Sequence, residues 1–495
     1  MPRLLPLVGP LKGLVRDGAP RLRSTAAVFT SMTALAAMSL VTGPALAEDG
    51  PAPCALRRTE AHHSEGLDSW NADYPRPTRP FDAVMVFLSF PDAGPETTPA
   101  ELTDDYFPAT NRFFARASYG RFSLRTHPVR QWIRMPHPST AYAINRDWSP
   151  GRRAAYLRDA LAAADRHVDF SRYDVVYFVA DPDAPGVDSD ATKVVNLDRP
   201  LRADGKDIRR VVTVFERHPP DRLVLAHETG HVFDLPDLYH RPVDGRGDWD
   251  TYVGDWDLMG SQFGLAPDLF AWHKWKLGWL DPRQVVCVKG PGSTRLTLEP
   301  VDAGPAPGDA GAAGVSGATG AAGASGVAGA AGVSGVAGAA GVSGAAGTAG
   351  APASAPVSAP VSAPVSVPVS APGIGVRPLA VAGRGTKLAV VRTGRDRVLA
   401  VEARDPVGND AAACTRGILV YRVRNGAESG DGPVQVVDAH PRTEACRNES
   451  VYPPLADAPV FTGETFTVPG EGVRVTVEGR TASGEWTVDI TTGTE

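Results

Sequence analysis

A tract of low complexity interrupts the chain and separates two parts of different character. From Gly308 to Gly350 glycine occupies every third position, and from Pro352 to Pro372 proline returns at every fourth. This tract has almost no side chains that can bury surface, so it cannot form a core of its own. We expect a flexible coil followed by a stiffer, polyproline-like spacer. A collagen-like triple helix is the alternative for a Gly-X-Y repeat, but proline is nearly absent from X and Y.

The segments that flank the tract both resemble β-strands. Thr294–Val301 (TRLTLEPV) precedes it and Lys387–Arg392 (KLAVVR) follows it. A long insertion in a loop costs little, because the closure entropy rises only by about 0.6 kcal/mol for each doubling of length. We therefore predict a low-complexity insertion at 303–375 within one β-rich domain, formed by 283–302 and 376–495, whose flanking strands pair.

The N-terminus has the three parts of an export signal. Basic residues are followed by the apolar stretch Thr25–Val41 and by the cleavage pattern Ala45-Leu46-Ala47. We predict a signal peptide at 1–47, with a membrane anchor as the alternative, and a secreted mature protein. The polar, proline-rich residues 48–80 are expected to form a tether or a short prosegment.

Composition limits the partners of the chain. Its 50 basic and 56 acidic residues give a net charge of −6, whereas a nucleic-acid-binding protein needs a basic face. No later stretch has the ~18 consecutive apolar residues of a membrane span. Arginine far outnumbers lysine, and Ala, Gly, Pro and Val are abundant, as in proteins from GC-rich bacterial genomes. The oligomeric state is not indicated.

The cysteines fit an exported protein. Four are present, no CxxC pair occurs, and an even number in an exported chain favours disulfides. We predict the pairs Cys54–Cys287 and Cys414–Cys446. The alternative for Cys54 is a prosegment thiol that caps a metal ion.

Hydrophobic periodicity predicts an α+β chain. In 81–282, buried strands are expected at Val84–Leu88, Tyr173–Val179 and Arg210–Phe215, with helices and one hairpin between and after them. The helices are expected at Thr110–Ser118, at Arg152–His167, after Pro219-Pro220-Asp221 and at Pro267–Leu277, and the hairpin at Gly120–Ile133. After residue 282 short strands recur at the spacing of a β-sandwich. They are expected at Thr294–Leu298, Leu388–Arg392, Leu399–Ala403, Ile418–Val423, Val434–Val437, Val473–Val477 and Trp486–Ile490.

The motif His227-Glu228-Thr229-Gly230-His231 carries the chemical signal. On a helix, His227 and His231 lie one turn apart on the same face, where both imidazoles can bind one zinc ion. Glu228 would then reach the water bound to the zinc. The alternative is an ordinary surface pair of histidines.

A catalytic zinc needs a third protein ligand. The chain has no Glu between Val232 and Leu298, which disfavours a glutamate from a following helix. Pro236 ends the helix, and the turn near Asp234 can bring Asp237 back to the metal. Asp237 is therefore the predicted ligand, with Asp234 and His240 as alternatives.

Two further features belong to this region. Met259, in the turn Gly254–Ser261 (GDWDLMGS), could form an apolar floor under the histidines, although a Met in such a turn is more often ordinary core. Tyr239 could assist the reaction or serve in packing. His273 is expected to be structural.

Taken together, these motifs resemble the immune inhibitor A-like metallopeptidases, secreted bacterial zinc endopeptidases related to the metzincins. The resemblance rests on HETGHxxxLPDLY, GDWDLMGSQ, AWHKWKLGWL, FLSFPD, ARASYGRFSL, DRVLAVEAR and GILVYRV, and it covers roughly 80–302 and 376–490. It implies a metzincin-like peptidase domain at 81–282, the zinc ligands His227, His231 and Asp237, the catalytic Glu228 and a Met-turn at Met259. The family usually has Gly where this chain has Asp234, which puts the geometry of that turn in doubt, although Asp adopts the left-handed conformation more easily than most residues.

The expected function is the zinc-dependent hydrolysis of peptide bonds in extracellular proteins or peptides. Zinc would activate the water, and Glu228 would act as the general base. A non-catalytic adhesion protein with a repeat stalk is the alternative, but every expected site residue is present. Calcium is a further candidate cofactor for two acidic stretches, which otherwise are solvated loops: Asp181, Asp183, Asp188 and Asp190, and Asp248, Asp250, Asp255 and Asp257.

Overall fold

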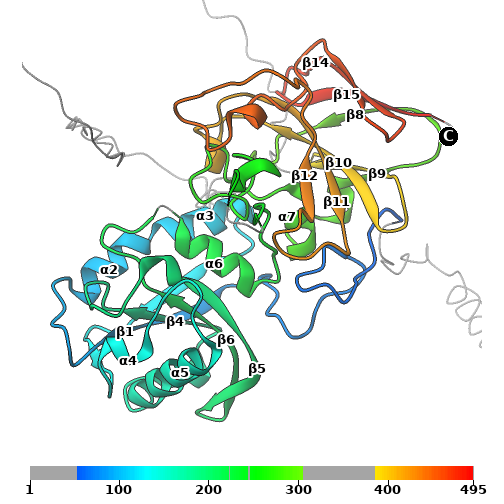
Figure 1. Cartoon of the computed structure of the whole chain (residues 1–495). Coiled ribbons are helices and arrows are strands. Elements are labelled where there is room, and N and C mark those ends of the chain that lie inside the picture. Colours follow the sequence, from blue (N-terminus) through cyan, green and yellow to red (C-terminus); the bar gives the residue numbers. More distant parts are fainter. Residues whose placement is uncertain (1–52, 222, 243–245, 305–384, 494–495) are drawn as a thin grey trace, which may run out of the picture.

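The computed structural model describes residues 53–221, 223–242, 246–304 and 385–493 (Figure 1). The predicted signal peptide at 1–47 and residues 305–375 of the predicted insertion lie outside these ranges. Over the described residues the chain has a mixed α and β structure with three sheets, in agreement with the predicted α+β class.

The first sheet has the strand order β2-β1-β4-β6-β5, and β3 also pairs with β1. Pairings within this sheet are parallel except that of β5 with β6, which is antiparallel and leaves β5 at an edge. The strands are β1 (Phe81–Ser89), β2 (Leu124–Pro128), β3 (Ile133–Arg134), β4 (Val175–Ala180), β5 (Lys193–Ala203) and β6 (Lys206–Val214).

Helices cover both faces of this sheet (Figure 1). Along β1, Ala83, Met85 and Phe87 join one hydrophobic core, while the intervening Val84 and Leu88 join another. A parallel strand between two helical layers reads as a continuous apolar run for this reason. One layer holds α2 (Pro99–Tyr106), α3 (Ala109–Ala117) and α6 (Val224–Val232); the other holds α4 (Ser139–Tyr142) and α5 (Pro150–Ala164).

Two predictions for this part need correction, and one strand was not predicted. The expected hairpin at Gly120–Ile133 is wrong, because β2 and β3 both run parallel to β1 and do not pair with each other. The expected helix at Pro267–Leu277 is shorter: α7 spans Ala271–Leu277. Strand β5 was missed. Its alternation is broken by a register shift between Asn196 and Leu201, where Asp-Arg-Pro resembles a turn.

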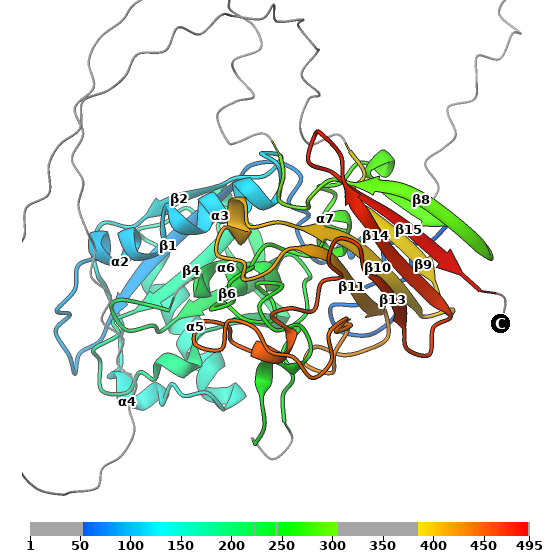
Figure 2. The same ribbon diagram turned by 90° about the horizontal axis from the view of Figure 1, so that it is seen from above.

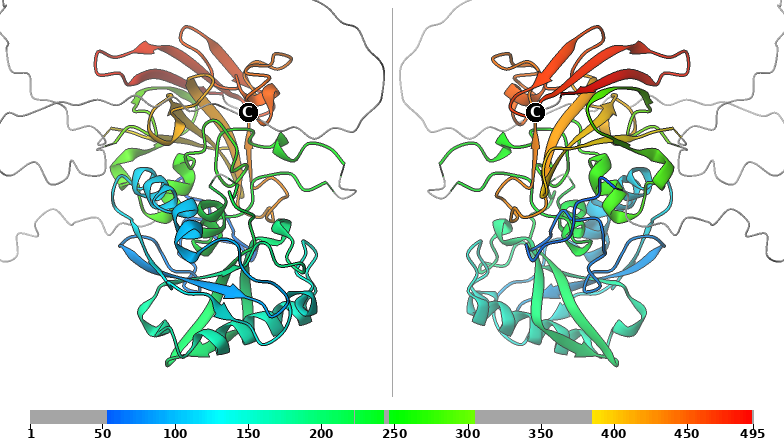
Figure 3. Two further views of the ribbon diagram at one scale, coloured as in Figure 1. Left: turned by 90° about the vertical axis from the view of Figure 1, so that its left-hand side faces the viewer. Right: turned by 90° about the vertical axis from the view of Figure 1, so that its right-hand side faces the viewer.

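The rest of the chain forms two antiparallel-rich sheets packed face to face (Figures 2 and 3). The strands predicted after residue 282 are all present, with ends that shift by up to three residues. The five-stranded sheet contains β7 (Val285–Val288), β9 (Leu388–Arg392), β10 (Arg397–Arg404), β11 (Gly417–Arg424) and β12 (Val434–Val436). The four-stranded sheet contains β8 (Gly292–Leu298), β13 (Thr465–Val468), β14 (Val473–Arg480) and β15 (Trp486–Thr492).

The five-stranded sheet is buried on both faces. Alternate residues such as Val401 and Val420 face the four-stranded sheet, whereas Ala400, Leu419 and Tyr421 pack into the core that also contains α6 and α7. The part of the chain beyond the tract therefore shares a core with the part that carries the HETGH motif.

The strands that flank residues 305–384 do not pair with each other as predicted. β8 pairs with β15 in one sheet, and β9 lies between β7 and β10 in the other. A backbone hydrogen bond from Glu299 N to Thr386 O, 2.8 Å long, joins the two segments instead. Lys387 adds a hydrogen bond from its Nζ to Pro300 O, at 2.6 Å.

Both predicted disulfides are confirmed. Cys54 is bonded to Cys287 and Cys414 to Cys446, with Cα–Cα distances of 5.5 and 6.2 Å. Cys54 is therefore not a free thiol that could cap a metal. No helix in the described ranges is both long and apolar enough to cross a membrane.

The N-terminal segment at 53–80 is packed into the fold, whereas a tether would leave its side chains in solvent. Leu56 and Glu65 are completely buried, and His63 is only 4% exposed. The disulfide of Cys54 fixes the beginning of the segment to β7. This segment is a structural part of the molecule that contacts both halves of the chain.

Candidate functional site

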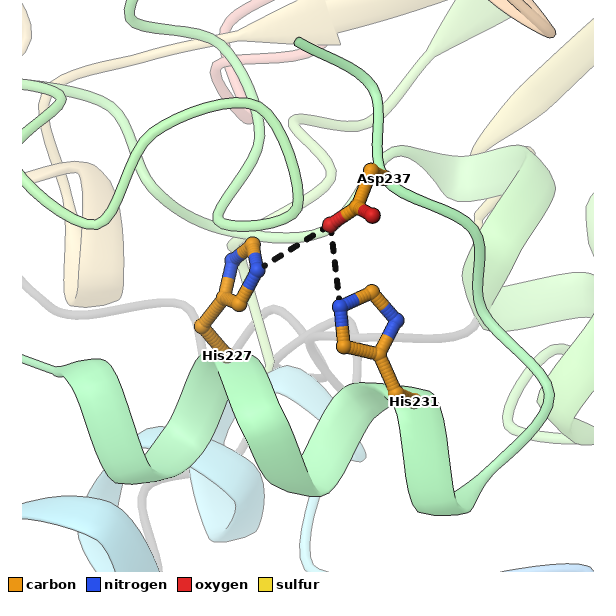
Figure 4. Close-up of side chains that lie close together, drawn as sticks. All are labelled: His227, His231 and Asp237. Carbon is orange, nitrogen blue, oxygen red and sulfur yellow. Dashed lines mark ion pairs between the residues drawn. The ribbon is translucent and has the colours of Figure 1, made fainter. Parts of the chain in front are cut away.

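Helix α6 places the two motif histidines on one face, one turn apart (Figure 4). All nine of its residues are buried, so the imidazoles of His227 and His231 are held among packed neighbours. Their ring centroids lie 4.9 Å apart and the rings are nearly perpendicular. The sequence prediction of a helix with both histidines on one face is confirmed.

Hydrogen bonds to backbone carbonyls define the state of both imidazoles. Nδ1 of His227 lies 2.9 Å from Leu258 O, and Nδ1 of His231 lies 2.8 Å from Leu235 O. A carbonyl oxygen only accepts hydrogen bonds, so each Nδ1 carries the proton. In the neutral rings each Nε2 is left with a lone pair that points away from the helix, as in a metal-binding histidine.

Asp237 completes the cluster. Its Oδ1 lies 3.3 Å from Nε2 of His227 and 3.0 Å from Nε2 of His231 (Figure 4). The three ligand atoms all lie within 4.8 Å of one another. Among the described residues, this is the one group of three or more His, Cys, Asp or Glu that could hold a metal.

Three electron-pair donors in a buried cluster repel one another unless a cation lies between them. Without a metal, burial lowers and Asp237 raises the pKa of His231, and the net effect is a rise to about 9. A proton then takes the place of the cation. Two imidazole nitrogens and one carboxylate are a ligand set that zinc accepts, with a fourth position left for water or substrate. The residues present thus fit a catalytic zinc ion.

A tight turn after α6 returns Asp237 to the histidines. Asp234 has a φ of 65°, the left-handed conformation expected at this position, and Leu235 N donates to Gly230 O. Beyond the turn, Asp237 N donates to Ser429 Oγ at 2.7 Å, and Ser429 Oγ donates to Asp237 Oδ2 at 3.1 Å. Residues of the β-rich part therefore orient the third candidate ligand.

The alternative ligands Asp234 and His240 are not part of the cluster. The carboxylate of Asp234 is completely buried and contacts two N-terminal side chains, Arg58 Nη1 at 2.8 Å and His63 Nδ1 at 3.0 Å. Its pKa lies below the ordinary range, because hydrogen bonds and nearby cations outweigh the effect of burial. Asp234 thus serves the turn and not the metal position.

Glu228 lies beside the cluster and faces strand β5. Its Oε2 accepts a hydrogen bond of 2.7 Å from Val194 N, at the edge of the first sheet. Burial raises the pKa of Glu228, and His231 and His227 partly offset that effect. A carboxylate with a raised pKa takes up a proton more readily than an exposed one.

Met259 lies beneath α6, as expected for a floor under the histidines. It is completely buried, and a Cβ added at Gly230 would lie under 3.0 Å from its sulfur. Only a glycine at position 230 permits this close approach. The neighbouring Asp257 supports the turn by accepting a hydrogen bond from Met259 N at 2.7 Å.

Tyr239 and His273 have different environments. The Tyr239 ring stacks on His227 at a centroid distance of 6.4 Å, and burial, Asp237 and Glu228 raise the pKa of its phenol. His273 is completely buried between Glu65 Oε1 at 2.9 Å and Asp257 Oδ2 at 3.1 Å. Tyr239 lines the cleft, whereas His273 is structural.

The two acidic stretches do not converge on a second centre within the described residues. Asp255 accepts hydrogen bonds from Leu265 N and Val451 N, and Asp257 supports the Met259 turn. In the other stretch, Asp181 Oδ1 accepts from Asp183 N. Calcium binding at these residues remains a prediction.

A cleft of two adjoining cavities, about 630 and 520 Å³, opens at the cluster. His227, Glu228 and Tyr239 line both cavities, whereas His231 and Asp237 line only the second, so the metal position lies in the second cavity at its border with the first. The cleft thus continues on two sides of the candidate centre.

Three contributors to the site were not found from the sequence. Val194 lies on the strand that was missed, and Ser429 lies in a polar loop with no motif. The contact of His63 with Asp234 joins residues 171 positions apart. Only Val195 and Leu197, the hydrophobic residues that follow Val194, carried a signal that could have been used.

Comparisons with protein-family models and with curated proteins found no match for this chain.

Proposed function

We propose that this protein is a secreted zinc-dependent endopeptidase. The observation that carries the proposal is the convergence of His227 Nε2, His231 Nε2 and Asp237 Oδ1 on one point, next to the buried carboxylate of Glu228. Zinc bound there would lower the pKa of a water molecule and polarise the scissile carbonyl.

Glu228 is the proposed general base. Its Oε2 is held by Val194 N, which fixes the side chain at the border of the two cavities. It would take a proton from the attacking water and pass it to the leaving amine. Its raised pKa suits both steps, since a stronger base accepts the proton and the resulting acid still releases it.

Strand β5 offers a binding surface for an extended peptide. It is the edge strand of the first sheet and passes beside Glu228. A substrate could add to such an edge as a further strand. Because the cleft continues on both sides of the centre, the substrate can extend in both directions, which favours cleavage within a chain.

The resemblance of the motifs to the immune inhibitor A-like metallopeptidases supports the same proposal. The departure from that pattern, Asp234 in place of Gly, is compatible with it because Asp234 adopts the left-handed turn and is paired with Arg58 and His63. The two disulfides agree with an extracellular location.

The test combines metal content with turnover. The Glu228→Gln protein should bind one zinc ion per chain, as the wild type does, but lose nearly all cleavage of an unfolded protein substrate. The control is Glu96→Gln, an exposed glutamate away from the cleft, which should change neither measurement. Full turnover by the Glu228→Gln protein, or no zinc in the wild type, would contradict the proposal.

A further inference from the structure

The two cavities of the cleft differ in the balance of charged residues that line them. The first cavity lies near the start of α6 and is lined by the carboxylates Glu216, Asp221 and Asp250, none of which lines the second cavity. The one cation that lines the first cavity but not the second is the exposed Arg217. None of these three carboxylates forms an ion pair with any residue that the structure describes. Counted with the residues that it shares with the second cavity, the first cavity has five carboxylates, because Asp190 and Glu228 also line it, against two cations, Arg146 and Arg217.

The surroundings of the carboxylates reflect this excess of negative charge. Burial, together with Asp221 and Glu228, raises the pKa of Glu216 to about 7. Burial and the neighbours Asp255 and Asp248 raise the pKa of Asp250 to about 6. A cation placed among these groups would stabilise their ionised forms.

The second cavity has an excess of cations once the two carboxylates of the candidate centre, Glu228 and Asp237, are set aside. Its lining then has the carboxylates Asp147 and Asp190 against four cations: Arg146, Arg153, Lys193 and Arg241. Burial and then the charge of Arg153 lower the pKa of Lys193. No ion pair of Arg153, Lys193 or Arg241 occurs within the described ranges.

The wall of the acidic cavity also suits a long basic side chain. Phe263 is 51% exposed there, the highest value for a large hydrophobic side chain among the described residues. Trp249 lines the same cavity. Lys and Arg side chains pack their aliphatic stems on such surfaces while the charged end reaches a carboxylate. A metal ion fits less well, because these carboxylates form no group with ligand atoms close enough to share one.

We propose that the enzyme selects peptides with a basic side chain on one side of the scissile bond and an acidic side chain on the other. The basic side chain binds among Glu216, Asp221 and Asp250, and the acidic one near Arg153, Lys193 and Arg241. This inference rests on the proposed peptidase function, because the charged cavities meet at its catalytic centre. Complementary charge favours the matched substrate, and like charge rejects the reversed one.

The experiment uses five fluorogenic peptides that differ only in the residues flanking the cleaved bond: Lys then Glu, Glu then Lys, Lys alone, Glu alone, and neither. The values of kcat/KM are measured on the full-length protein at low and high salt. One of the two doubly charged peptides should exceed its reversed partner by at least tenfold, and salt should reduce the difference.

Variants assign each preference to its cavity. The double variant Glu216→Gln/Asp250→Asn should lower the preference for Lys over the neutral peptide, and Arg153→Gln should lower the preference for Glu. Asp165→Asn and Arg166→Gln are matched controls, since both residues are exposed at the end of α5, outside both cavities. They should leave all ratios as in the wild type, and melting temperatures verify that every variant folds.

Binding to the Glu228→Gln protein separates this inference from the proposed function. If the wild type cleaves no peptide but this variant still binds one charge order at least tenfold more tightly, the peptidase proposal fails and the charge selection stands. If the wild type cleaves all five peptides within a threefold range, the charge selection is wrong and the peptidase proposal stands. Equal binding together with no cleavage would overturn both.

Discussion

Ser429 forms two hydrogen bonds to Asp237, one to its backbone N–H at 2.7 Å and one to its carboxylate at 3.1 Å. Ser429 follows β11, in the β-rich part of the chain, whereas Asp237 follows α6. The candidate metal centre is thus completed across the boundary between the two parts. Partners that orient a metal ligand in this way typically contribute to the metal affinity of the site.

Ser429→Ala should weaken zinc binding by about 10–100-fold without unfolding the protein. The hydroxyl is lost, so the carboxylate of Asp237 is free to turn away from the histidines. Competition with a chromogenic chelator measures the affinity. Ser483→Ala, in a loop of the four-stranded sheet, is the control and should bind zinc as the wild type does. An unchanged affinity in Ser429→Ala would remove the positioning role.

Asp234 and Asp237 should respond differently to substitution. Asp237→Ala should lose zinc and turnover together. Asp234→Gly should keep zinc, because glycine retains the left-handed turn, but should lower the free energy of unfolding by about 2–3 kcal/mol. This decrease is smaller than the one expected when a fully buried ion pair is broken, because the partner Arg58 is partly exposed. Zinc content and urea unfolding are measured for both variants. If Asp234→Gly loses the metal and Asp237→Ala keeps it, the assignment of the third ligand is wrong.

The contact between Gly230 and Met259 predicts a strong effect of one methyl group. Gly230→Ala should destabilise the protein by about 1–3 kcal/mol, because the new Cβ meets the Met259 sulfur in a packed core. Gly151→Ala is the matched control, since Gly151 lies in α5 with nothing within 4 Å of an added Cβ. It should be neutral or stabilise by up to about 1 kcal/mol. Equal melting temperatures for the two variants would contradict the close packing.

His273 should make stability depend on pH. Burial lowers its pKa, but Glu65 and Asp257 raise it to about 9. The unfolded value is about 6.5, so the folded protein binds this proton more tightly than the unfolded chain. The stabilisation is complete below about pH 6.5 and is lost as the pH rises to about 9, at about 1 kcal/mol per pH unit.

The measurement is urea unfolding from pH 6 to 9.5 with excess zinc, so that His227 and His231 do not titrate. The wild type should lose stability over this range, and His273→Gln should lose much less. Parallel curves for the two proteins would show that the proton on His273 has no such role.

Removal of residues 305–384 should leave the folded protein intact. The hydrogen bonds from Glu299 to Thr386 and from Lys387 to Pro300 hold the flanking residues together. A short Gly/Ser linker in place of 305–384 should therefore preserve the melting temperature and the zinc affinity. A fall in either value would mean that the replaced residues contribute to the fold.

The sequence predicted those parts of the site that lie close together along the chain. His227, Glu228, His231 and Asp237 fall within eleven residues, so helix geometry and one proline were enough to relate them. The central strands β1, β4 and β6 were also predicted, because a strand covered on both faces has an uninterrupted apolar run.

What the sequence did not reveal depends on contacts between distant residues. Ser429 lies 192 positions from Asp237, and no local pattern marks it. The segment 53–80 is polar in composition, yet His63 and Glu65 are buried because Asp234 and His273 provide partners for them. The parallel pairing of β2 and β3 with β1 was misread because alternation alone does not define which strand is the neighbour.

The N-terminal segment also affects the time at which the site can be assembled. Cys54 forms its disulfide with a cysteine 233 positions later in the chain, and the buried carboxylate of Glu65 forms its ion pair with His273. In a chain that emerges from its first residue onward, the disulfide of this segment cannot form until residue 287 has emerged. Asp237 meets its partner later, after residue 429 has emerged. An incomplete chain lacks a group that orients the candidate ligand Asp237, so the candidate site cannot be completed before residue 429 has been added.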